Sequence, residues 1–529
     1  MSHKVLISDT LSEQGLERLR SVPELDIDLR PGLPPDELIR AIPAYQALII
    51  RSGTKVTKAV IAAATNLRVI GRAGIGVDNV DVEAATKQGI VVMNTPGGNN
   101  VTTAEHALSL LLALSRNIPQ ANASLKAGRW EREKFTGSEV CNKILGVIGL
   151  GNIGAIVAER ALGLKMRVLA YDPFVSSETA AKLRIELGSL EEIYAKADFI
   201  TVHTPLTKDT RGLINAAAFA KMKKGVRIIN CARGGIVDEN ALLQAITSGT
   251  VAGAALDVFV EEPPPAHHPL LKLEQVICTP HLGAATDEAQ INVAIAIADQ
   301  VALFLTEGVI QNAVNFPALT AKQRVILQPY LTLGEKLGSF LAQLSIDAPQ
   351  EVQVEYSGEV VEYEIAPVTA AVLRGVLSPV LESPVNYVNA PFIARERGIR
   401  VVESRSSRPS DFLNSVRVQV TSASGTNMVE GAVFSNKAVR LVRVNAFHLE
   451  AVPEGYILVI HNHDVPGVVG LMGTLLGKHG INIAGLELGR EKIGGKAIAL
   501  IHVDDQVPVA VLTEFQALEP IISAQQIRL

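Results

Sequence analysis

The sequence predicts an α/β protein with two Rossmann-like, doubly wound parallel sheets, followed by an α+β region and a compact βαββαβ unit. Three observations support this prediction. Apolar strand-like runs alternate with helical patterns from residue 4 to about residue 315, which is typical of βαβ units. A glycine-rich turn, Gly149 to Gly154, separates a buried strand-like run from a helix. From Tyr456 to Leu529 the order is strand, helix, strand, strand, helix, strand.

The size and composition fit this division. A chain of 529 residues with 48% hydrophobic content is too large for one core and should form about three or four domains. The net charge of -5 and the pI near 6.2 argue against a nucleic-acid or anionic-membrane partner. Apolar runs such as Leu108 to Leu114 fall short of the ~18 residues of a membrane span.

The cysteines and the N-terminal segment indicate the compartment. Cys141, Cys231 and Cys278 have the spacing of neither a zinc site nor a disulfide framework. We therefore expect no metal site, and we expect the cysteines to be core residues in a reducing cytoplasm. The N-terminal residues read as a strand, a turn and an amphipathic helix, without the apolar run of a signal peptide.

The first block of alternating elements spans Lys4 to about Pro96. Its strand-like runs include KVLISD, ALIIRS, LRVIGRAG and GIVVMN. A long apolar helix is predicted from Ala104, and a segment rich in arginine and lysine follows it. That segment, AGRWEREK, contains the only tryptophan, Trp130.

The glycine-rich turn opens the second block and predicts a dinucleotide site. The run KILGVI precedes the turn as a buried strand, and AIVAERALGL continues it as a helix. Glycines allow the backbone to approach a pyrophosphate, whose charge meets the helix N-terminus. Asp172 ends the next strand, 23 residues after Gly149. An acid at this place suits the ribose hydroxyls of NAD and repels the extra phosphate of NADP, although a turn or cap role is the alternative.

Three polar residues follow later strand-like runs of the second block. Arg233 follows VRIINCA, Glu262 follows GAALDVFVE, and His281 follows QVICTP. Because the ligand crevice of an open α/β sheet lies outside the carboxyl ends of its strands, these side chains are expected to converge. Taken singly, Arg233 could form a structural ion pair, Glu262 could be a solvated loop acid, and His281 could be a capped loop residue.

A long helix is predicted after His281, ending near Gly308, and the pattern then changes. Residues 318 to about 450 carry alternating strand signals without a strong catalytic motif. This region contains a group of arginines that could bind an anion, although a solvated face is the preferred interpretation. These are Arg395, Arg397, Arg400, Arg405 and Arg408.

The motifs of both blocks resemble those of the D-isomer-specific 2-hydroxyacid dehydrogenase family. In chain order they are GRAGIGVDNVD, NTPGGNN, GLGNIG, NCARGGIVDE, ALDVFVEEPP and TPHLGAAT. Within this family the chain resembles the enzymes with long chains, which oxidise 3-phosphoglycerate and carry an intervening domain and an ACT domain. The features that carry this resemblance are GRAG, WEREKF and the C-terminal unit. The implied domains are a discontinuous substrate-binding domain (1–97 and 295–317), an NAD-binding domain (98–294), an intervening domain (318–452) and an ACT domain (453–529).

The resemblance implies roles that the chemistry of the side chains supports. The planar fork of Arg233 suits the C1 carboxylate and the reacting carbonyl. His281 would accept the C2 hydroxyl proton, and Glu262 would orient and stabilise its imidazole. Asp257 resembles the acid near the nicotinamide amide, and Thr204 resembles a cofactor-loop contact. The expected NAD-binding residues are Gly149, Gly151, Asn152, Ile153, Gly154, Asp172, Thr204, Cys231, Ala232, Arg233, Asp257, His281, Gly283 and Ala284.

Substrate choice in this family depends on what lies beyond C2. For 3-phosphoglycerate, guanidinium groups would meet the phosphate, and Arg51, Arg72 and Arg132 are the candidates. Each could instead be a solvated surface charge. The resemblance places the segment of Arg132 near a dimer interface, so that this arginine could act in the site of a neighbouring subunit. A homodimer or homotetramer is therefore expected.

By its likeness to ACT domains, the C-terminal unit would bind L-serine, the end product of the pathway. Asn462, Asp464 and Asn482 are the candidate contacts, and simple turn or cap roles are the alternative. Two other functions remain open at this point. One is another 2-hydroxyacid dehydrogenase, acting on glycerate or hydroxypyruvate, and the other is an NAD-sensing binding protein without catalysis.

Overall fold

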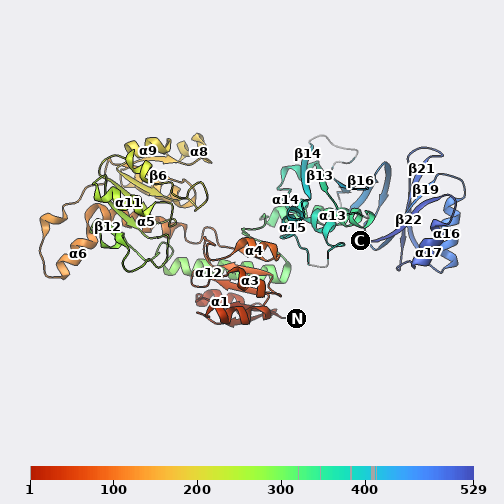
Figure 1. Cartoon of the computed structure of the whole chain (residues 1–529), viewed down its shortest axis with the longest axis horizontal. Helices are drawn as coiled ribbons and strands as arrows, with labels where there is room; N and C mark the ends of the chain where they lie inside the picture. The colour runs from red at the N-terminus through yellow and green to blue at the C-terminus, as the bar shows by residue number, and fades with distance from the viewer. Residues whose placement is uncertain are drawn as a thin grey trace.

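The computed structural model confirms the predicted fold class. It describes residues 2–317, 319, 321–345, 347–381, 384–406, 412, 414–435 and 437–529, so that Arg408 lies outside the described part of the chain. Two parallel sheets come first, a mixed sheet follows, and an antiparallel sheet ends the chain. Figure 1 shows them along the long axis, with the second parallel sheet at one end and the antiparallel sheet at the other.

The first sheet is parallel, with the order β2-β1-β3-β4-β5. Both faces are covered, because apolar residues point to α1 and α12 on one side and to α2, α3 and α4 on the other. The half-polar run LDIDL, which the sequence analysis does not identify as a strand, forms the edge strand β2. The bounds are β1 His3–Ile7, α1 Glu13–Arg20, β2 Leu25–Leu29, α2 Pro35–Ala41, β3 Ala47–Ile50, α3 Lys58–Ala63, β4 Val69–Arg72, α4 Val82–Lys87 and β5 Val91–Met93.

The second sheet is also parallel, with the order β12-β11-β10-β9-β6-β7-β8 and an apolar core on each face. Its first strand, β6, lies inside the sheet, and the chain turns from it into α7 at the glycine-rich turn. The strands are β6 Ile144–Ile148, β7 Arg167–Tyr171, β8 Glu186–Leu187, β9 Phe199–Val202, β10 Val226–Asn230, β11 Val251–Leu256 and β12 Val276–Cys278. The helices are α7 Asn152–Gly163, α8 Ser177–Lys182, α9 Leu190–Lys196, α10 Ala216–Ala220 and α11 Glu239–Thr247.

Two long helices carry the chain between the two parallel sheets. Helix α5 (Asn100–Arg116) leads from the first sheet to the second, and α12 (Asp287–Glu307) returns to the first, as Figure 1 shows. Gly308 ends α12 in the left-handed conformation, as expected. Within the described part of the chain, α12 alone has the length and apolar character of a membrane span, and 56% of that stretch is buried, chiefly against the first sheet.

An arm follows α5 and projects from the second sheet. It consists of α6 (Ile118–Lys126) and a short 3-10 turn, η2 (Arg132–Phe135). Figure 1 places α6 at the far end of the molecule, on the side of the second sheet away from the first. The arm exposes three large apolar side chains, Ile118, Leu125 and Trp130.

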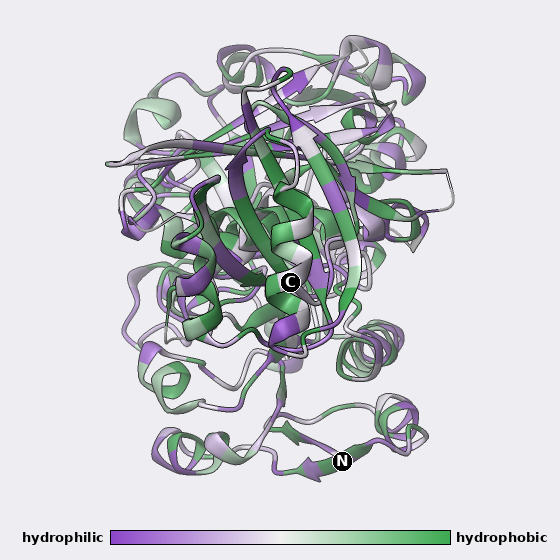
Figure 2. Ribbon diagram, turned by 90° about the vertical axis from the view of Figure 1, so that its right-hand side faces the viewer, coloured by the Kyte–Doolittle hydropathy of each residue, from purple (hydrophilic) through white to green (hydrophobic). Residues whose placement is uncertain are grey.

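The C-terminal half contains the mixed and the antiparallel sheets, which share one core. Apolar residues of α13 and the mixed sheet form a single cluster with Ile457, Val459 and Ile527 of the antiparallel sheet. In Figure 2 the strands and helices nearest the viewer carry long apolar stretches. The elements are α13 Ala321–Leu344, β13 Glu351–Ser357, α14 Ala366–Leu377, α15 Ala390–Glu396, β14 Arg400–Ser406, β15 Ser415–Ser422, β16 Gly425–Val433, β17 Val439–Val444 and β18 Phe447–Ala451.

The antiparallel sheet has the order β20-β21-β19-β22, and α16 and α17 cover its other face. Its connection order confirms the predicted βαββαβ arrangement. The elements are β19 Tyr456–His463, α16 Val468–Lys478, β20 Ile483–Arg490, β21 Lys496–Val503, α17 Val509–Gln516 and β22 Ile521–Arg528.

Candidate active site

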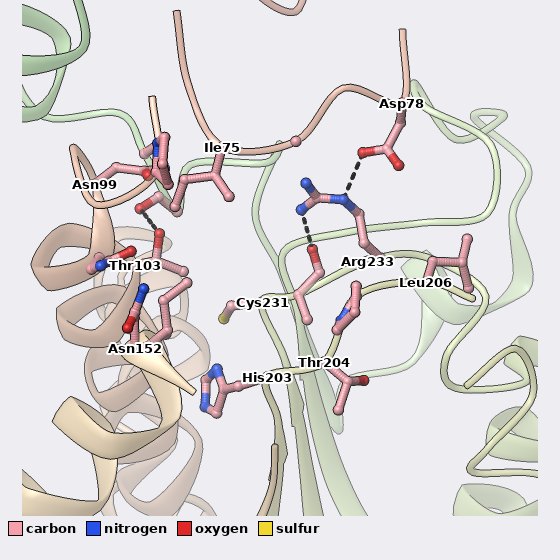
Figure 3. Close-up of a pocket in the computed structure, with 18 of the residues that line it drawn as sticks. Ile75, Asp78, Asn99, Thr103, Asn152, His203, Thr204, Leu206, Cys231 and Arg233 are labelled. Atoms are coloured by element: carbon pink, nitrogen blue, oxygen red, sulfur yellow. Dashed lines mark hydrogen bonds and ion pairs between the residues drawn. The ribbon is translucent and has the colours of Figure 1, made fainter. Parts of the chain in front are cut away.

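A cleft of about 450 Å³ lies where the loops of the first sheet face those of the second. Figure 3 shows Ile75, Asp78 and Asn99 on one side, with His203, Cys231 and Arg233 among the residues opposite. Ten of the predicted residues line it, namely Arg72, Asn152, Ile153, Thr204, Cys231, Ala232, Arg233, His281, Gly283 and Ala284. The other predicted residues of this half lie outside the lining, namely Arg51, Arg132, Gly149, Gly151, Gly154, Asp172, Asp257 and Glu262.

The glycine-rich turn has the geometry that a dinucleotide requires. Gly149 follows β6 with φ of 93°, and a Cβ there would lie 2.6 Å from the carbonyl oxygen of His203. A Cβ on Gly154 would lie 1.9 Å from the Gly149 oxygen, whereas Gly151 faces open space at the N-terminus of α7. The turn therefore presents free backbone to a phosphate group and lets the helix approach closely.

Two orphaned polar atoms in the cleft wall also favour a bound cofactor. The hydroxyl of Thr204 and the amide oxygen of Asn99 are buried without a hydrogen-bond partner. Buried polar atoms normally have partners, so these two atoms are suited to groups of a ligand. Cys231 lines the same wall, and burial raises the pKa of its thiol, which suits a neutral packing residue. Cys278 is half-buried and Cys141 is exposed, so the prediction that the cysteines are core residues is wrong for Cys141.

Asp172 lies after β7 and is already hydrogen-bonded to backbone. Its Oδ2 accepts from the Leu150 N–H at 2.8 Å, and its Oδ1 accepts from the Phe174 N–H at 2.9 Å. The carboxylate thus joins the glycine-rich turn to the loop after β7. Each oxygen retains a second lone pair, so this turn role is compatible with the predicted ribose contact.

Arg233 reaches across the cleft to the first sheet. Its Nε donates to Asp78 Oδ2 at 2.7 Å, and its Nη1 donates to the carbonyl of Ala232 at 2.8 Å, as Figure 3 shows. Its Nη2 lies against Gly76, where a Cβ would be 1.8 Å away. The guanidinium is therefore fixed at the cleft by an ion pair between the two parallel-sheet regions, with Nη2 pointing at the 74–78 loop.

His281 and Glu262 form a hydrogen-bonded pair beside Arg233. The imidazole Nδ1 lies 2.7 Å from Glu262 Oε2, and the other carboxylate oxygen accepts from the Phe259 N–H at 3.1 Å. Burial raises the pKa of Glu262, but the hydrogen bonds from His281 and Phe259 outweigh it, and the net pKa is lowered. The carboxylate is thus ionised at neutral pH and holds the imidazole with Nε2 free for substrate.

Asp257 lies under the loop that carries His281. Its side chain is fully buried and accepts from the backbone N–H groups of Leu282 and Gly283 at 2.7 and 2.8 Å. Burial raises the pKa of Asp257, whereas hydrogen bonds from His106 and Thr279 lower it by more, so its net pKa is low. This placement makes Asp257 a support of the His281 loop, in addition to its predicted role near the nicotinamide.

Two of the three predicted phosphate arginines lie at neighbouring strand ends of the first sheet. Arg72 ends β4 opposite Ile50 of β3, which Arg51 directly follows. Arg72 lines the cleft and its Nε is buried without a partner. Burial and the nearby Arg233 lower the pKa of Arg72 to about 10, so it stays protonated at neutral pH. A buried cation without an acceptor on Nε is suited to an anionic substrate group.

Arg132 does not join this group within one chain. It is exposed on η2, in the arm beyond α6, and it does not line the cleft. Its predicted contact with substrate therefore requires the arm of a second chain.

The sequence analysis missed three ionisable residues in or beside the cleft. Asp78 and His203 line it, and His106 contacts Asp257 from α5. Burial lowers the pKa of His203 to about 4, so its ring is neutral. Asp78 is part of the quoted motif GVDNVD, which could have identified it. His106 sits in an apolar helix, where a single histidine gives no distinct signal.

The predicted effector residues lie at two ends of the antiparallel sheet. Asn462 is buried near the end of β19, and its amide oxygen has no partner. Asp464 follows that end and accepts from the Gly494 N–H at 3.1 Å. Asn482 precedes β20, whose first residue is level with Val503 and Tyr456 at the opposite end. One chain therefore does not bring Asn482 to the other two residues.

Three family models match this chain. The D-isomer specific 2-hydroxyacid dehydrogenase NAD-binding domain matches residues 108–283. The D-3-phosphoglycerate dehydrogenase intervening domain matches residues 326–445, and the ACT domain matches residues 456–520.

Similar proteins extend over the whole length. Two D-3-phosphoglycerate dehydrogenases, from Synechocystis sp. and Archaeoglobus fulgidus, are each 44% identical to this chain. Both alignments cover 99% of this chain, and they cover 95% of the Synechocystis protein and 100% of the Archaeoglobus protein. Among solved structures, the TT0316 protein from Thermus thermophilus is 36% identical, with a TM-score of 0.55 over 59% of this chain and 99% of that chain. An NAD-dependent formate dehydrogenase from Staphylococcus aureus, solved with NAD, is 28% identical, with a TM-score of 0.54 over 58% of this chain and 97% of that chain.

Proposed function

This chain belongs to the D-3-phosphoglycerate dehydrogenases within the D-isomer-specific 2-hydroxyacid dehydrogenase family, and we propose that Arg233, Glu262 and His281 are its catalytic residues. It is an NAD-dependent enzyme that oxidises 3-phospho-D-glycerate to 3-phosphohydroxypyruvate, the first step of phosphorylated serine synthesis. One observation supports the catalytic assignment most directly. His281 and Arg233 line one cleft, and Glu262 holds the imidazole at 2.7 Å.

The proton is handled by His281. With Nδ1 engaged by Glu262, Nε2 is the atom that takes the proton of the C2 hydroxyl. The Glu262 carboxylate stabilises the imidazolium that results. The glycine-rich turn would hold NAD, which would supply the acceptor for the hydride that leaves C2. In the reverse reaction the imidazolium returns the proton to the carbonyl oxygen.

Arg233 positions and polarises the substrate. Its guanidinium is held by Asp78 through Nε, which leaves Nη2 beside the 74–78 loop to meet the C1 carboxylate. Close to Arg233, Arg72 and Arg51 supply the charge that a phosphate requires. Glycerate and lactate lack the phosphate, so these extra cations favour the phosphorylated substrate. A non-catalytic NAD sensor would not require the hydrogen-bonded pair of Glu262 and His281.

The working unit is proposed to be an oligomer formed through the arm. Ile118, Leu125 and Trp130 are 53, 56 and 81% exposed, and a cluster of exposed apolar side chains of this kind marks a protein interface. Docking of the arm on a second chain would cover them and would bring Arg132 to the neighbouring cleft. We propose a homodimer as the minimal unit and a homotetramer as the larger alternative.

L-serine is the proposed effector, bound between two C-terminal sheets. Asn462 and Asp464 from one chain would meet Asn482 from another, because one chain places them at opposite ends. The orphaned amide oxygen of Asn462 could accept from the ammonium group of the amino acid. We assign the enzyme to the cytoplasm, in keeping with its three free thiols, Cys141, Cys231 and Cys278.

The proposed function is tested by measuring NADH formation with 3-phosphoglycerate, glycerate and D-lactate, with and without L-serine. We expect turnover with 3-phosphoglycerate to exceed that with the other two acids, and L-serine to reduce it. Turnover of glycerate or D-lactate in preference would redirect the substrate assignment. Absence of turnover with all three acids would favour the NAD-sensing alternative.

A further inference from the structure

The loop that presents His281 has a backbone conformation that requires support. His281 has φ of +53°, in the left-handed region that a non-glycine residue rarely adopts. Its N–H donates to the carbonyl oxygens of Asp257 and Thr279, at 2.9 and 3.0 Å. The next two N–H groups, of Leu282 and Gly283, donate to the Asp257 carboxylate. The direction of the catalytic imidazole therefore depends on where Asp257 is held.

His106 is the residue that holds Asp257 from outside this loop. Its Nε2 lies 3.1 Å from Asp257 Oδ1 and 3.2 Å from the Thr279 hydroxyl oxygen. Thr279 itself donates its hydroxyl proton to the same Oδ1 at 2.6 Å. An ionised carboxylate only accepts hydrogen bonds, so His106 Nε2 carries the proton and donates to Asp257. His106 is 18% exposed and Asp257 is fully buried, so water cannot easily replace this hydrogen bond.

The same part of α5 is joined to the His281 loop at two more points. Thr103 donates its hydroxyl proton to the Gly283 carbonyl at 2.9 Å, and Figure 3 shows this contact beside the cleft. The hydroxyl of Thr102 lies 3.4 Å from that of Thr286, the N-cap of α12. Because α5 and α12 are the two crossings between the parallel sheets, this network connects the crossings to the catalytic loop.

We propose that His106 is a positioning residue for the reaction, which acts through Asp257 and Thr279 to hold His281 at the angle that reaches the substrate. The inference rests on the proposed catalytic role of His281. His106 does not line the cleft, so its proposed role is indirect, through Asp257 and Thr279. Its loss should therefore slow the chemical step while leaving substrate binding largely intact.

The test compares His106→Leu with His106→Gln. Leucine fills the space but removes the donor, whereas the glutamine amide can still donate to Asp257. For His106→Leu we expect kcat to fall about 10- to 100-fold, since a shift of about 1 Å in a catalytic group can cost that much. The KM for 3-phosphoglycerate should stay within about threefold of the wild-type value, because Arg233 and Arg72 are unchanged. His106→Gln should recover most of the lost rate.

A kinetic isotope effect separates positioning from simple damage to the fold. With substrate deuterated at C2, slower chemistry in His106→Leu should raise the primary isotope effect on kcat above the wild-type value. Loss of folded protein would lower the rate per total enzyme with an unchanged isotope effect, and that result would overturn the proposal. A His106→Leu kcat within about twofold of wild type would also overturn it.

A second variant keeps the test decisive if His106→Leu does not fold. Thr279→Val removes the other side-chain donor to the same oxygen at similar volume, and it should show the same fall in kcat and the same rise in the isotope effect. Unchanged values for this variant would count against the network. All comparisons presuppose that the wild-type enzyme oxidises 3-phosphoglycerate. An inactive wild type would refute the proposed function, whereas an active wild type with unaffected variants would refute only the role of His106.

Discussion

The active-site cleft and the C-terminal sheet place their functional candidates in opposite ways. In the parallel second sheet, Arg233 and His281 follow different strands and both line one cleft, and Glu262, which follows a third strand, is hydrogen-bonded to His281. In the antiparallel sheet, Asp464 follows β19 and Asn482 precedes β20, and the sheet separates them. Parallel strands have all their carboxyl ends at one edge, whereas the C-terminal unit would need a second copy to combine its two ends in the proposed effector site.

The two regions differ in how much of each proposed site a single chain contains. At the cleft, the imidazole of His281 is held by the ionised Glu262 and the guanidinium of Arg233 is fixed, so the proposed proton transfer would use groups of one chain. The effector candidates lie at opposite ends of one sheet and Arg132 lies on the exposed arm, so the sites proposed for them would use a second chain. Catalysis and its regulation would thus be built at different levels of assembly.

His281→Ala should have the largest effect, because it removes the group that moves the proton. We expect kcat to fall about 10²- to 10⁴-fold, while NADH binding measured by fluorescence changes little. His267→Ala is the matched control, since His267 is exposed nearby and does not line the cleft. An unchanged kcat for His281→Ala would remove this histidine from the mechanism.

Glu262→Gln should have a smaller effect, because amide and carboxylate can both accept from the imidazole. Loss of the charge should reduce kcat about 10- to 100-fold, the range expected for a hydrogen bond to a charged group. Glu261→Gln is the control, since Glu261 is exposed and adjacent. Equal effects of the two substitutions would show that Glu262 is a solvated loop acid.

The pH dependence of this pair follows from the lowered pKa of Glu262. A carboxyl group whose pKa is lower in the folded than in the unfolded protein stabilises the fold at pH values above its unfolded pKa, about 4.3. This stabilisation is lost as the pH falls through the folded pKa. The difference in free energy of unfolding between wild type and Glu262→Gln, measured by chemical denaturation, should therefore persist from neutral pH down to about pH 5 and shrink below about pH 4. A difference that is already lost near neutral pH would contradict the ionised carboxylate.

Much of the cleft could be predicted from the sequence because short motifs encode it. Each of the predicted positions follows an apolar strand, and the parallel topology brings such positions together. They are the glycines of the turn, Asp172 and the three proposed catalytic residues. The edge strand β2 escaped prediction because its run LDIDL is half polar. His106 escaped prediction because its role depends on a hydrogen bond to Asp257, which lies 151 residues away.

The separation of the effector candidates could not be predicted in the same way. Asn462 lies near the end of β19, Asp464 follows that strand and Asn482 precedes β20, but the sequence does not specify which strands pair. Both β19 and β20 pair antiparallel with β21, so they run parallel to each other, and the start of β20 lies at the end opposite to Asn462 and Asp464. The exposed position of Arg132 likewise depends on the arm beyond α5, for which the sequence contains no packing signal.

A subunit-mixing experiment tests whether the cleft depends on a second chain for substrate. Arg132→Ala should reduce kcat/KM for 3-phosphoglycerate about tenfold, a loss typical of one charged hydrogen bond. If Arg132 acts across the interface, a heterodimer of Arg132→Ala and His281→Ala subunits has one intact site, formed by His281 of the first and Arg132 of the second. Activity of about half the wild-type value per heterodimer is then expected. Near-complete inactivity would show that Arg132 acts within its own chain.

Substitutions at the effector candidates of the C-terminal unit should have the smallest effect. They should change inhibition by L-serine without changing the rate measured in its absence. Asn462→Ala and Asn482→Ala should each raise the L-serine concentration for half-inhibition about tenfold, with D-serine as the stereochemical control. In a mixed dimer, a site built from two chains keeps one intact copy, formed by Asn462 of one subunit and Asn482 of the other. Sensitivity should then return partially on mixing. If mixing restores nothing, the residues act within one chain, and since the sheet separates them, Asn482 would then be an ordinary turn residue paired with Asp504.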